Sequence, residues 1–220
     1  MPFGVDEAGK GPVLGSMFAA AVWVEDEALL PDDVADSKRL TPTRRESLAE
    51  RIRSTERIAV GVTEITPERI DDPRTDMNSL TVEAHASSIE RALTDAADDA
   101  PTTPTGLCDA CDTDANRFAR RVAEASDLEI VVDAEHGADD DSSVVGAASV
   151  IAKVERDAHV ATLAETYGEI GSGYPSDPTT RTFLEEYVAD RGELPPCART
   201  SWSTCADVLE TAGQRSLGEF

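Results

Sequence analysis

Basic residues are scarce in this chain. Lysine and arginine together number 20, against 44 aspartates and glutamates, and lysine occurs only as Lys10, Lys38 and Lys153. The net charge of −24 excludes the broad basic surface that gives most nucleic-acid-binding proteins their affinity for phosphate. A nucleic-acid partner would therefore require these few basic residues to gather at one site.

Long apolar runs are also missing. The longest, Met17 to Val24, is far shorter than the roughly 20 residues of a membrane-spanning helix. Asp6 and Glu7 stand near the N-terminus, where a signal peptide would carry positive charge. We therefore expect a soluble, cytoplasmic protein with no membrane partner.

The acidic surplus has two explanations. Chains of low hydrophobicity and high charge are often disordered or form acidic partner-binding modules. Here 40% of the residues are hydrophobic, and acidic runs such as Asp139 to Asp141 stand between apolar, periodic segments. This pattern favours a folded core under an acidic surface adapted to high salt, because in roughly molar salt the Debye length is only about 3 Å.

The four cysteines do not have the spacing of a zinc ribbon. Cys108 and Cys111 are separated by two residues, whereas Cys197 and Cys205 are separated by seven. We expect buried thiols, the usual state of cysteine in an intracellular chain.

Apolar periodicity predicts an α/β fold with a mixed β-sheet flanked by helices and a small C-terminal helical extension. We expect a main domain over residues 1–177, the extension over 178–212 and a flexible tail over 213–220. The expected strands cover 3–8, 14–24, 57–63, 106–109 and 128–134, and the expected helices cover 42–54, 78–97, 112–126, 144–167, 179–190 and 204–212.

Acidic residues stand at the predicted strand ends. Asp6 and Glu7 close the first strand, Asp109 closes the strand at 106–109, and Asp139 precedes the long helix. Strand ends and helix starts meet at one edge of an α/β sheet, where carboxylates suit a hard divalent cation. Strand alternation points Asp6 and Glu7 to opposite faces unless the strand bends or ends near Ala8. Taken alone, Asp139 is better explained as a helix cap within an acidic run.

A phosphate-binding loop is the competing interpretation of the same segment. Gly4, Gly9 and Lys10 fit the pattern G-x-x-x-x-G-K, but Gly11 takes the place of the required serine or threonine. Two acidic side chains inside the cradle would also repel phosphate. We therefore prefer the metal site.

Five segments resemble, in order and spacing, the sequence blocks of the ribonuclease HII (type 2 ribonuclease H) family, in its archaeal branch. They are DEAGKGPV (6–13), DSKRLT (36–41), CDACDTDANRFA (108–119), AEHGADDDSSVVGAASVIAKVERD (134–157) and GSGYPSDPTT (171–180). The resemblance spans most of the chain. It implies a ribonuclease H-like catalytic domain over 1–177 and a monomer, and the archaeal branch fits the salt-adapted composition.

The resemblance implies a metal-dependent endonuclease. Such an enzyme cuts the RNA strand of RNA–DNA hybrids, and duplex DNA on the 5′ side of embedded ribonucleotides, leaving 5′-phosphate and 3′-hydroxyl ends. His136 is a candidate proton shuttle, although a structural role is the simpler explanation. The carboxylates that the family uses to bind two Mg²⁺ or Mn²⁺ ions correspond to Asp6, Glu7, Asp109 and Asp139.

The resemblance also implies the substrate contacts. The turn Gly9-Lys10-Gly11 and Tyr174 match the family's Gly-Arg-Gly turn and the tyrosine that help to read the ribose 2′-hydroxyl. Lysine in place of arginine keeps the backbone contact and loses a bidentate phosphate contact. Lys38 and Lys153 fall within matched blocks and are expected to bind substrate.

The C-terminus resembles the peptide with which replication and repair proteins bind sliding clamps. Gln214, Leu217 and Phe220 recur every three residues, so one 3₁₀ turn would place them on one face. The peptide usually carries two aromatic residues, and here there is one. The alternative is a frayed terminus.

Two other functions stay open. One is another carboxylate–metal nuclease of the same fold, which the ribose-reading turn and Tyr174 argue against. The other is a non-enzymatic acidic module that binds cations or basic partners. That module predicts metal binding without turnover and no dependence on Asp109.

Overall fold

The computed structural model describes the chain except for residues 1–2, 35–39, 97–98 and 218–220. None of the described helices has a stretch long and apolar enough to cross a membrane. The chain packs as two compact units, which are described separately. The first comprises Met1–Ala8, Phe18–Glu64 and Met77–Arg156, and the second comprises Gly9–Met17, Ile65–Asp76 and Asp157–Phe220.

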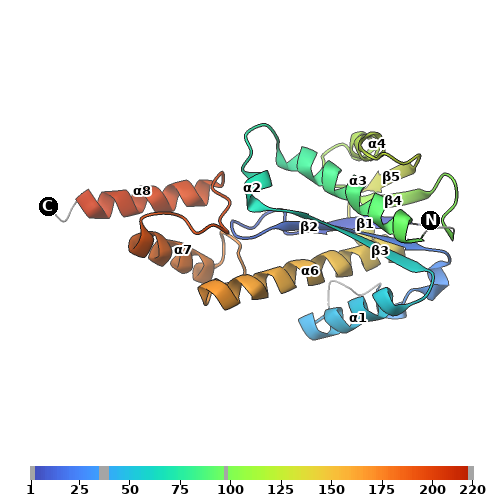
Figure 1. Cartoon of the computed structure of the whole chain (residues 1–220), viewed down its shortest axis with the longest axis horizontal. Helices are drawn as coiled ribbons and strands as arrows, with labels where there is room; N and C mark the ends of the chain where they lie inside the picture. The colour runs from blue at the N-terminus through green and yellow to red at the C-terminus, as the bar shows by residue number, and fades with distance from the viewer. Residues whose placement is uncertain (1–2, 35–39, 97–98, 218–220) are drawn as a thin grey trace. The chain divides into compact units, whose positions relative to one another are not determined.

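The first unit is built on a five-stranded sheet (Figure 1). The strand order is β3-β2-β1-β4-β5, and β1 is antiparallel to β2 and parallel to β4, which is parallel to β5. All eight residues of β2 are apolar and buried, as expected for a strand covered on both faces. The strands are β1 (Phe3–Ala8), β2 (Met17–Val24), β3 (Ile58–Ile65), β4 (Thr105–Asp109) and β5 (Val131–Glu135).

Helices cover both faces of this sheet (Figure 1). On one face, α3 (Met77–Ala96) and α4 (Ala115–Ala125) pack on a core that includes Phe3 and Val5 of β1. On the other face, α1 (Pro42–Ser54) and the first part of α6 (Ser143–Tyr167) pack on alternate residues of β2. The mixed sheet flanked by helices that the sequence predicts is therefore confirmed.

Glycine at residue 4 allows α6 to approach β1 closely. A Cβ atom at Gly4 would lie 2.5 Å from the carbonyl carbon of Val144 and 2.7 Å from its oxygen. These distances are too short for any side chain, so the backbone of α6 rests directly on β1 at this point. Even-numbered residues of β1 thus face α6, and odd-numbered residues face α3.

Most predicted elements of the first unit are present, with ends shifted by at most three residues. The strand predicted from Leu14 begins at Met17, because Gly15 has a φ of 79° and Leu14 instead forms an isolated bridge with Ala198. The sequence does not predict the short helices η1 (Glu27–Leu29), α2 (Pro67–Ile70) and α5 (Ala138–Asp141).

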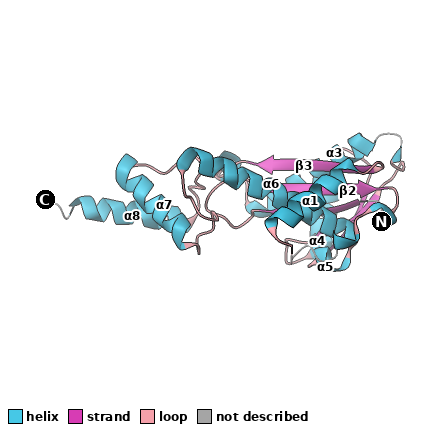
Figure 2. Cartoon of the chain, turned by 90° about the horizontal axis from the view of Figure 1, so that it is seen from below, coloured by secondary structure: helices cyan, strands magenta, loops and turns pink. Residues whose placement is uncertain are grey.

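The second unit contains α7 (Pro178–Arg191) and α8 (Ser203–Leu217), which lie beside each other in Figure 2. Their apolar faces share a core with Val13, Leu14 and Ile170. The helix expected over 204–212 extends to Leu217, so Gln214 lies in α8 and not in a tail. The side chain of Leu217 and all of Phe220 lie outside the described part of the chain.

Candidate functional site

Asp6 and Glu7 lie at the end of β1, on opposite faces of the sheet. The antiparallel register continues through Asp6, Glu7 and Ala8, so strand alternation holds to the last residue. Asp6 is buried on the side of α6. Glu7 faces α3, where its Oε2 lies 2.8 Å from Nε2 of His85.

Asp109 ends β4, which is the parallel neighbour of β1. The backbone N–H of Ala138 donates a hydrogen bond of 2.9 Å to Asp109 Oδ1. Ala138 follows Gly137, whose φ of 69° is in the left-handed region, which glycine adopts without a Cβ clash. The turn before α5 therefore orients the Asp109 carboxylate.

Asp139 lies within α5, and its side chain points inward. It is 6% exposed, whereas Asp140 and Asp141 are exposed, which distinguishes it from its acidic neighbours. Its Oδ2 accepts a hydrogen bond of 3.5 Å from Ser149 Oγ and lies 3.9 Å from Lys153 Nζ. Lys153 in turn donates to Ser149 Oγ at 2.7 Å.

Burial and neighbouring carboxylates affect the pKa of Asp6 and of Asp109. Burial is the largest cause that raises the pKa of Asp6, and the charges of Glu7 and Asp109 raise it further. Burial also raises the pKa of Asp109, with added contributions from Asp139 and Glu7 and an opposing one from the Ala138 hydrogen bond. Asp6 and Asp109 therefore both lie within the field of neighbouring carboxylates at this edge of the sheet.

The donor set suits a hard divalent cation, although the side chains are not arranged as a finished binding site. Among the described residues, no three His, Cys, Asp or Glu side chains form a group close enough to hold a metal ion. Carboxylate oxygens are the ligands that Mg²⁺ prefers, and a bound cation would stabilise the charged form of acids whose pKa is raised, such as Asp6 and Asp109. The residues present therefore fit such an ion.

The predicted substrate turn lies in the second unit together with Tyr174. Gly9 has a φ of 87°, and a Cβ atom at Gly11 would lie 3.6 Å from Tyr174 Cε1. Tyr174 is 39% exposed, so its ring remains accessible and is not packed into the core. Lys38, the third lysine predicted to bind substrate, lies outside the described residues.

Arg199 contacts this turn, and the sequence interpretation missed it. Its side chain is fully buried, and its guanidinium donates to the carbonyl oxygens of Gly9, Lys10 and Gly15 at 2.6, 2.9 and 2.8 Å. Trp202 lies against it, with the guanidinium carbon 5.1 Å from the ring centre. Arg199 thereby fixes the backbone of Gly9-Lys10-Gly11.

Two further polar residues near the carboxylates were missed as well. Ser149 and His85 are both fully buried and contact Asp139 and Glu7, respectively. Ser149 precedes Lys153 by one helical turn within a matched block, and that spacing was a usable signal. His85 lies outside every matched block, and nothing local in the sequence marks it.

The remaining candidates have simpler environments. His136 is exposed, and its Nδ1 lies 3.0 Å from the carbonyl oxygen of Ala110. All four cysteines are free thiols. Burial raises the pKa of Cys108 well above its ordinary value, which makes this thiol a poor nucleophile.

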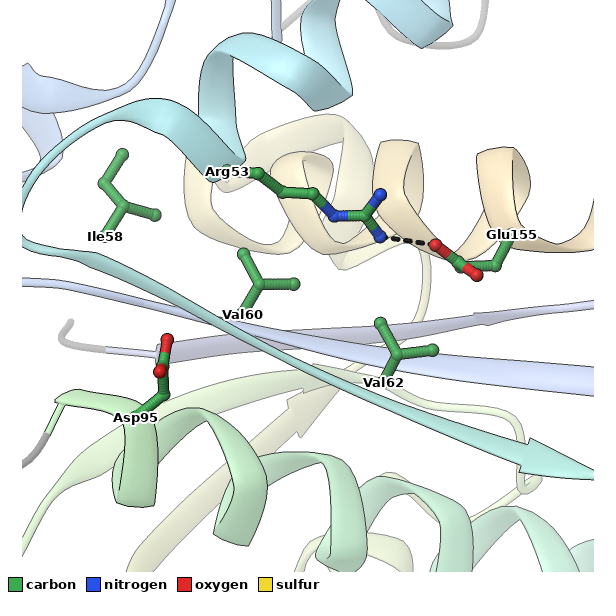
Figure 3. Close-up of a pocket in the computed structure, with 6 residues that line it drawn as sticks. All are labelled: Arg53, Ile58, Val60, Val62, Asp95 and Glu155. Carbon is green, nitrogen blue, oxygen red and sulfur yellow. Dashed lines mark hydrogen bonds and ion pairs between the residues drawn. The ribbon is translucent and has the colours of Figure 1, made fainter.

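A cavity of about 400 Å³ lies on the outer part of the sheet, away from the carboxylates. Figure 3 shows its apolar floor of Ile58, Val60 and Val62 on β3 and the ion pair between Arg53 and Glu155, which are 2.5 Å apart. Asp95 lies apart from that pair. This cavity lacks converging acids and does not belong to the site.

Two solved structures share this fold over nearly the whole chain. The crystal structure of ribonuclease H2 from Pyrococcus horikoshii OT3 matches with a TM-score of 0.87 at 36% identity, covering 96% of this chain and 98% of that one. A chain in the structure of the PCNA:RNase HII complex from Archaeoglobus fulgidus matches with a TM-score of 0.81 at 39% identity, covering 94% and 96%. The fold and its acidic sheet edge thus define a hydrolase of the ribonuclease H class.

Comparison with known sequences identifies the family within this class. The family model described as Ribonuclease HII matches residues 3–205. Ribonuclease HII of Haloarcula marismortui is 60% identical over 220 residues, which is the whole of both chains. The chain belongs to the ribonuclease HII family and is an endoribonuclease that acts on the RNA of RNA–DNA hybrids. The haloarchaeal source of this relative agrees with the salt-adapted composition of the chain.

Proposed function

We propose that this enzyme also cuts duplex DNA on the 5′ side of embedded ribonucleotides, as a cytoplasmic monomer whose four site carboxylates hold two Mg²⁺ or Mn²⁺ ions. The observation that carries the proposal is the raised pKa of Asp6 and of Asp109, for which burial is the largest cause. The charges of Glu7 and Asp109 add to it at Asp6, and those of Asp139 and Glu7 add to it at Asp109. Buried acids that repel one another at the ends of two parallel strands are costly unless a cation offsets their charge.

The residues around the carboxylates support this assignment. The two bound ions would activate the attacking water and stabilise the leaving 3′ oxygen, so that products carry 5′-phosphate and 3′-hydroxyl ends. The N–H of Ala138 orients Asp109. Ser149 and Lys153 hold Asp139 from α6, which gives Lys153 a positioning role in addition to the predicted contact with substrate phosphate.

The second unit supplies the groups proposed to recognise ribose. The backbone of Gly9-Lys10-Gly11 and the exposed ring of Tyr174 lie together, at Gly11. The 2′-hydroxyl is the group that distinguishes RNA from DNA, and a glycine turn lets the backbone approach a sugar closely. Lys10 and Lys38 are proposed to contact the adjoining phosphates.

The test uses a labelled DNA duplex that contains one ribonucleotide, with Mg²⁺ or Mn²⁺ in high salt. We expect Asp109→Asn and Asp139→Asn each to lower kcat/KM by about a thousandfold, because several kcal/mol of charge stabilisation would be lost. Asp140→Asn is the matched control. It changes an exposed neighbour of Asp139 and should leave the rate within about twofold, as surface substitutions usually do.

Three outcomes separate the alternatives. A cut on the 5′ side of the ribonucleotide that depends on Asp109 supports the proposal. Cleavage of long hybrids without cleavage at the single ribonucleotide would restrict the enzyme to hybrids. Equal activity of Asp139→Asn and Asp140→Asn would remove Asp139 from the metal site.

We also propose that the C-terminus binds a sliding clamp through Gln214, Leu217 and Phe220. The similar ribonuclease HII from Archaeoglobus fulgidus is found in a complex with PCNA. In this chain Gln214 is exposed near the end of α8, and its Nε2 donates to Glu210 Oε1 at 3.2 Å. That bond lies on the surface of α8, so breaking it when Gln214 binds a clamp would cost little free energy.

Deletion of residues 214–220 should abolish clamp binding and leave cleavage of short duplexes intact. Binding can be measured by surface plasmon resonance with the clamp immobilised. Phe220→Ala should weaken it by at least tenfold, because buried aromatic anchors dominate such interfaces. Unchanged clamp affinity after the deletion would exclude the tail as the binding segment.

A further inference from the structure

His85 occupies an unusual position for a polar side chain. It lies on α3 with no exposed surface, and the edge of its ring meets Phe118 at a centroid distance of 5.2 Å and an angle of 83°. Its one polar contact in the described chain is the 2.8 Å bond from Nε2 to Glu7 Oε2. The ring is otherwise packed between α3 and α4, against Phe118.

The second ring nitrogen of His85 has no partner. Nδ1 is buried, and no hydrogen-bonding atom of the described residues reaches it. A buried polar atom without a partner lowers stability, whereas an apolar ring of similar size would fill the same space without that loss. Packing therefore does not explain why a histidine stands here.

The bond to Glu7 does offer an explanation. A carboxylate can only accept a hydrogen bond, so Nε2 of His85 carries the proton in this bond. The donated bond engages Oε2 and limits rotation of the Glu7 side chain, which is part-exposed at the end of β1. Residues that orient a metal-binding side chain from outside commonly set metal affinity in this way.

We propose that His85 is a positioning residue, which holds the Glu7 carboxylate in the orientation needed to bind a divalent cation. This inference rests on the proposed function in one respect, namely that Glu7 is a ligand of that cation. It assigns to α3 a part in the site that none of the matched sequence blocks indicates. His85 thus lowers the stability of the fold through its unpaired Nδ1 and raises the affinity of the site for the cation through its bond to Glu7.

The test measures Mn²⁺ binding and thermal unfolding of the full chain in high salt, without substrate. Bound Mn²⁺ is followed by loss of the electron paramagnetic resonance signal of the free ion. We expect His85→Phe to weaken Mn²⁺ binding by about tenfold while the melting temperature without metal stays the same or rises. His85→Gln retains an N–H donor and should recover most of the affinity.

A purely structural role predicts the opposite pattern. His85→Phe would then lower the melting temperature and leave Mn²⁺ affinity unchanged, which would overturn the proposal. If the phenylalanine variant does not fold, the same comparison is made between His85→Leu and His85→Gln. Equal Mn²⁺ affinity of those two variants would also overturn it.

Glu7→Gln separates this proposal from the proposed function. If it weakens Mn²⁺ binding, the combination with His85→Phe should cause little further loss, because the two residues act through one carboxylate. Additive losses would show that His85 acts elsewhere and would overturn the proposal. If Glu7→Gln itself binds Mn²⁺ normally, the ligand assignment in the proposed function fails, and the role of His85 fails with it.

Discussion

At the scale of single residues, Arg199 is notable because its side chain binds several backbone carbonyl groups at once. One buried guanidinium satisfies the carbonyl oxygens of Gly9, Lys10 and Gly15. Trp202 Nε1 donates to Gly11 at 3.3 Å, so the third residue of the turn is held as well. A planar, five-donor group is required for this arrangement, and lysine cannot reproduce it.

Arg199→Lys should therefore loosen the turn. We expect kcat/KM at an embedded ribonucleotide to fall by roughly ten- to a hundredfold, because small displacements of binding groups are costly to catalysis. Mn²⁺ affinity should not change, since the carboxylates belong to the other unit. Steady-state kinetics and Mn²⁺ titration of the same preparation check both statements.

The control for Arg199→Lys is Arg191→Lys, which changes an exposed arginine whose contact is Asp190. It should leave kinetics and Mn²⁺ affinity within about twofold of the parent protein. A normal rate in Arg199→Lys would mean that the turn is fixed by other contacts.

Residues also differ in how far the sequence could predict their roles. Asp6, Glu7 and Asp109 could be proposed as ligands because each stands in a matched block at a predicted strand end. His85 and Arg199 could not, because their partners lie 78 and up to 190 positions away. Only the fold brings such distant residues into contact, and no local pattern records it.

At the scale of elements, the loop before α7 is organised by its cap. Asp177 accepts hydrogen bonds from the N–H groups of Ser172 and Thr179 at 2.6 and 2.9 Å. A hydrogen bond from the Ser172 side chain is the largest cause that lowers the pKa of Asp177 from its ordinary value of 3.8 to about 2, followed by the bonds from the N–H groups of Ser172 and Thr179. The same loop carries Tyr174.

Asp177→Asn should destabilise the protein at neutral pH and progressively less in acid. The carboxylate has a lower pKa in the folded state, so its contribution is present above about pH 4 and is lost as the pH falls towards about 2. Urea unfolding of both proteins between pH 7 and pH 2.5 measures the difference. A difference between the two proteins that is the same at pH 7 and at pH 2.5 would contradict this role of the Asp177 carboxylate.

The ends of some helices and strands could not be predicted from the sequence. The apolar run from Leu14 predicts a strand, but Gly15 and the bridge from Leu14 to Ala198 delay its start. Likewise, α5 consists of Ala138 and three aspartates, a composition that signals a loop or a cap. The N-terminal position of these acids stabilises a short helix, and burial of Ala138 and Asp139 supports it.

At the scale of the whole molecule, the acidic surplus determines the conditions for folding. A chain with a net charge of −24 repels itself when the Debye length is about 30 Å, as in 0.01 M salt, and much less when it is about 3 Å, as in 1 M salt. High salt also favours burial of apolar surface.

The melting temperature should therefore rise by tens of degrees between about 0.05 M and 2 M KCl. Scanning calorimetry at several KCl concentrations measures the rise. Sucrose, which is excluded from protein surfaces but does not screen charge, should reproduce only a minor part of it. A melting temperature independent of KCl would contradict the interpretation of the acidic surface.

The contact at Gly4 also affects the position of the groups that α6 carries. The first turn of α6 rests on the bare backbone of β1, and the same helix carries Ser149 and Lys153 towards Asp139. A single added methyl group at residue 4 would displace α6 and widen the distance between its donors and the acids. The separation between α6 and the acidic residues is therefore set in part by residue 4, which has no side chain at all.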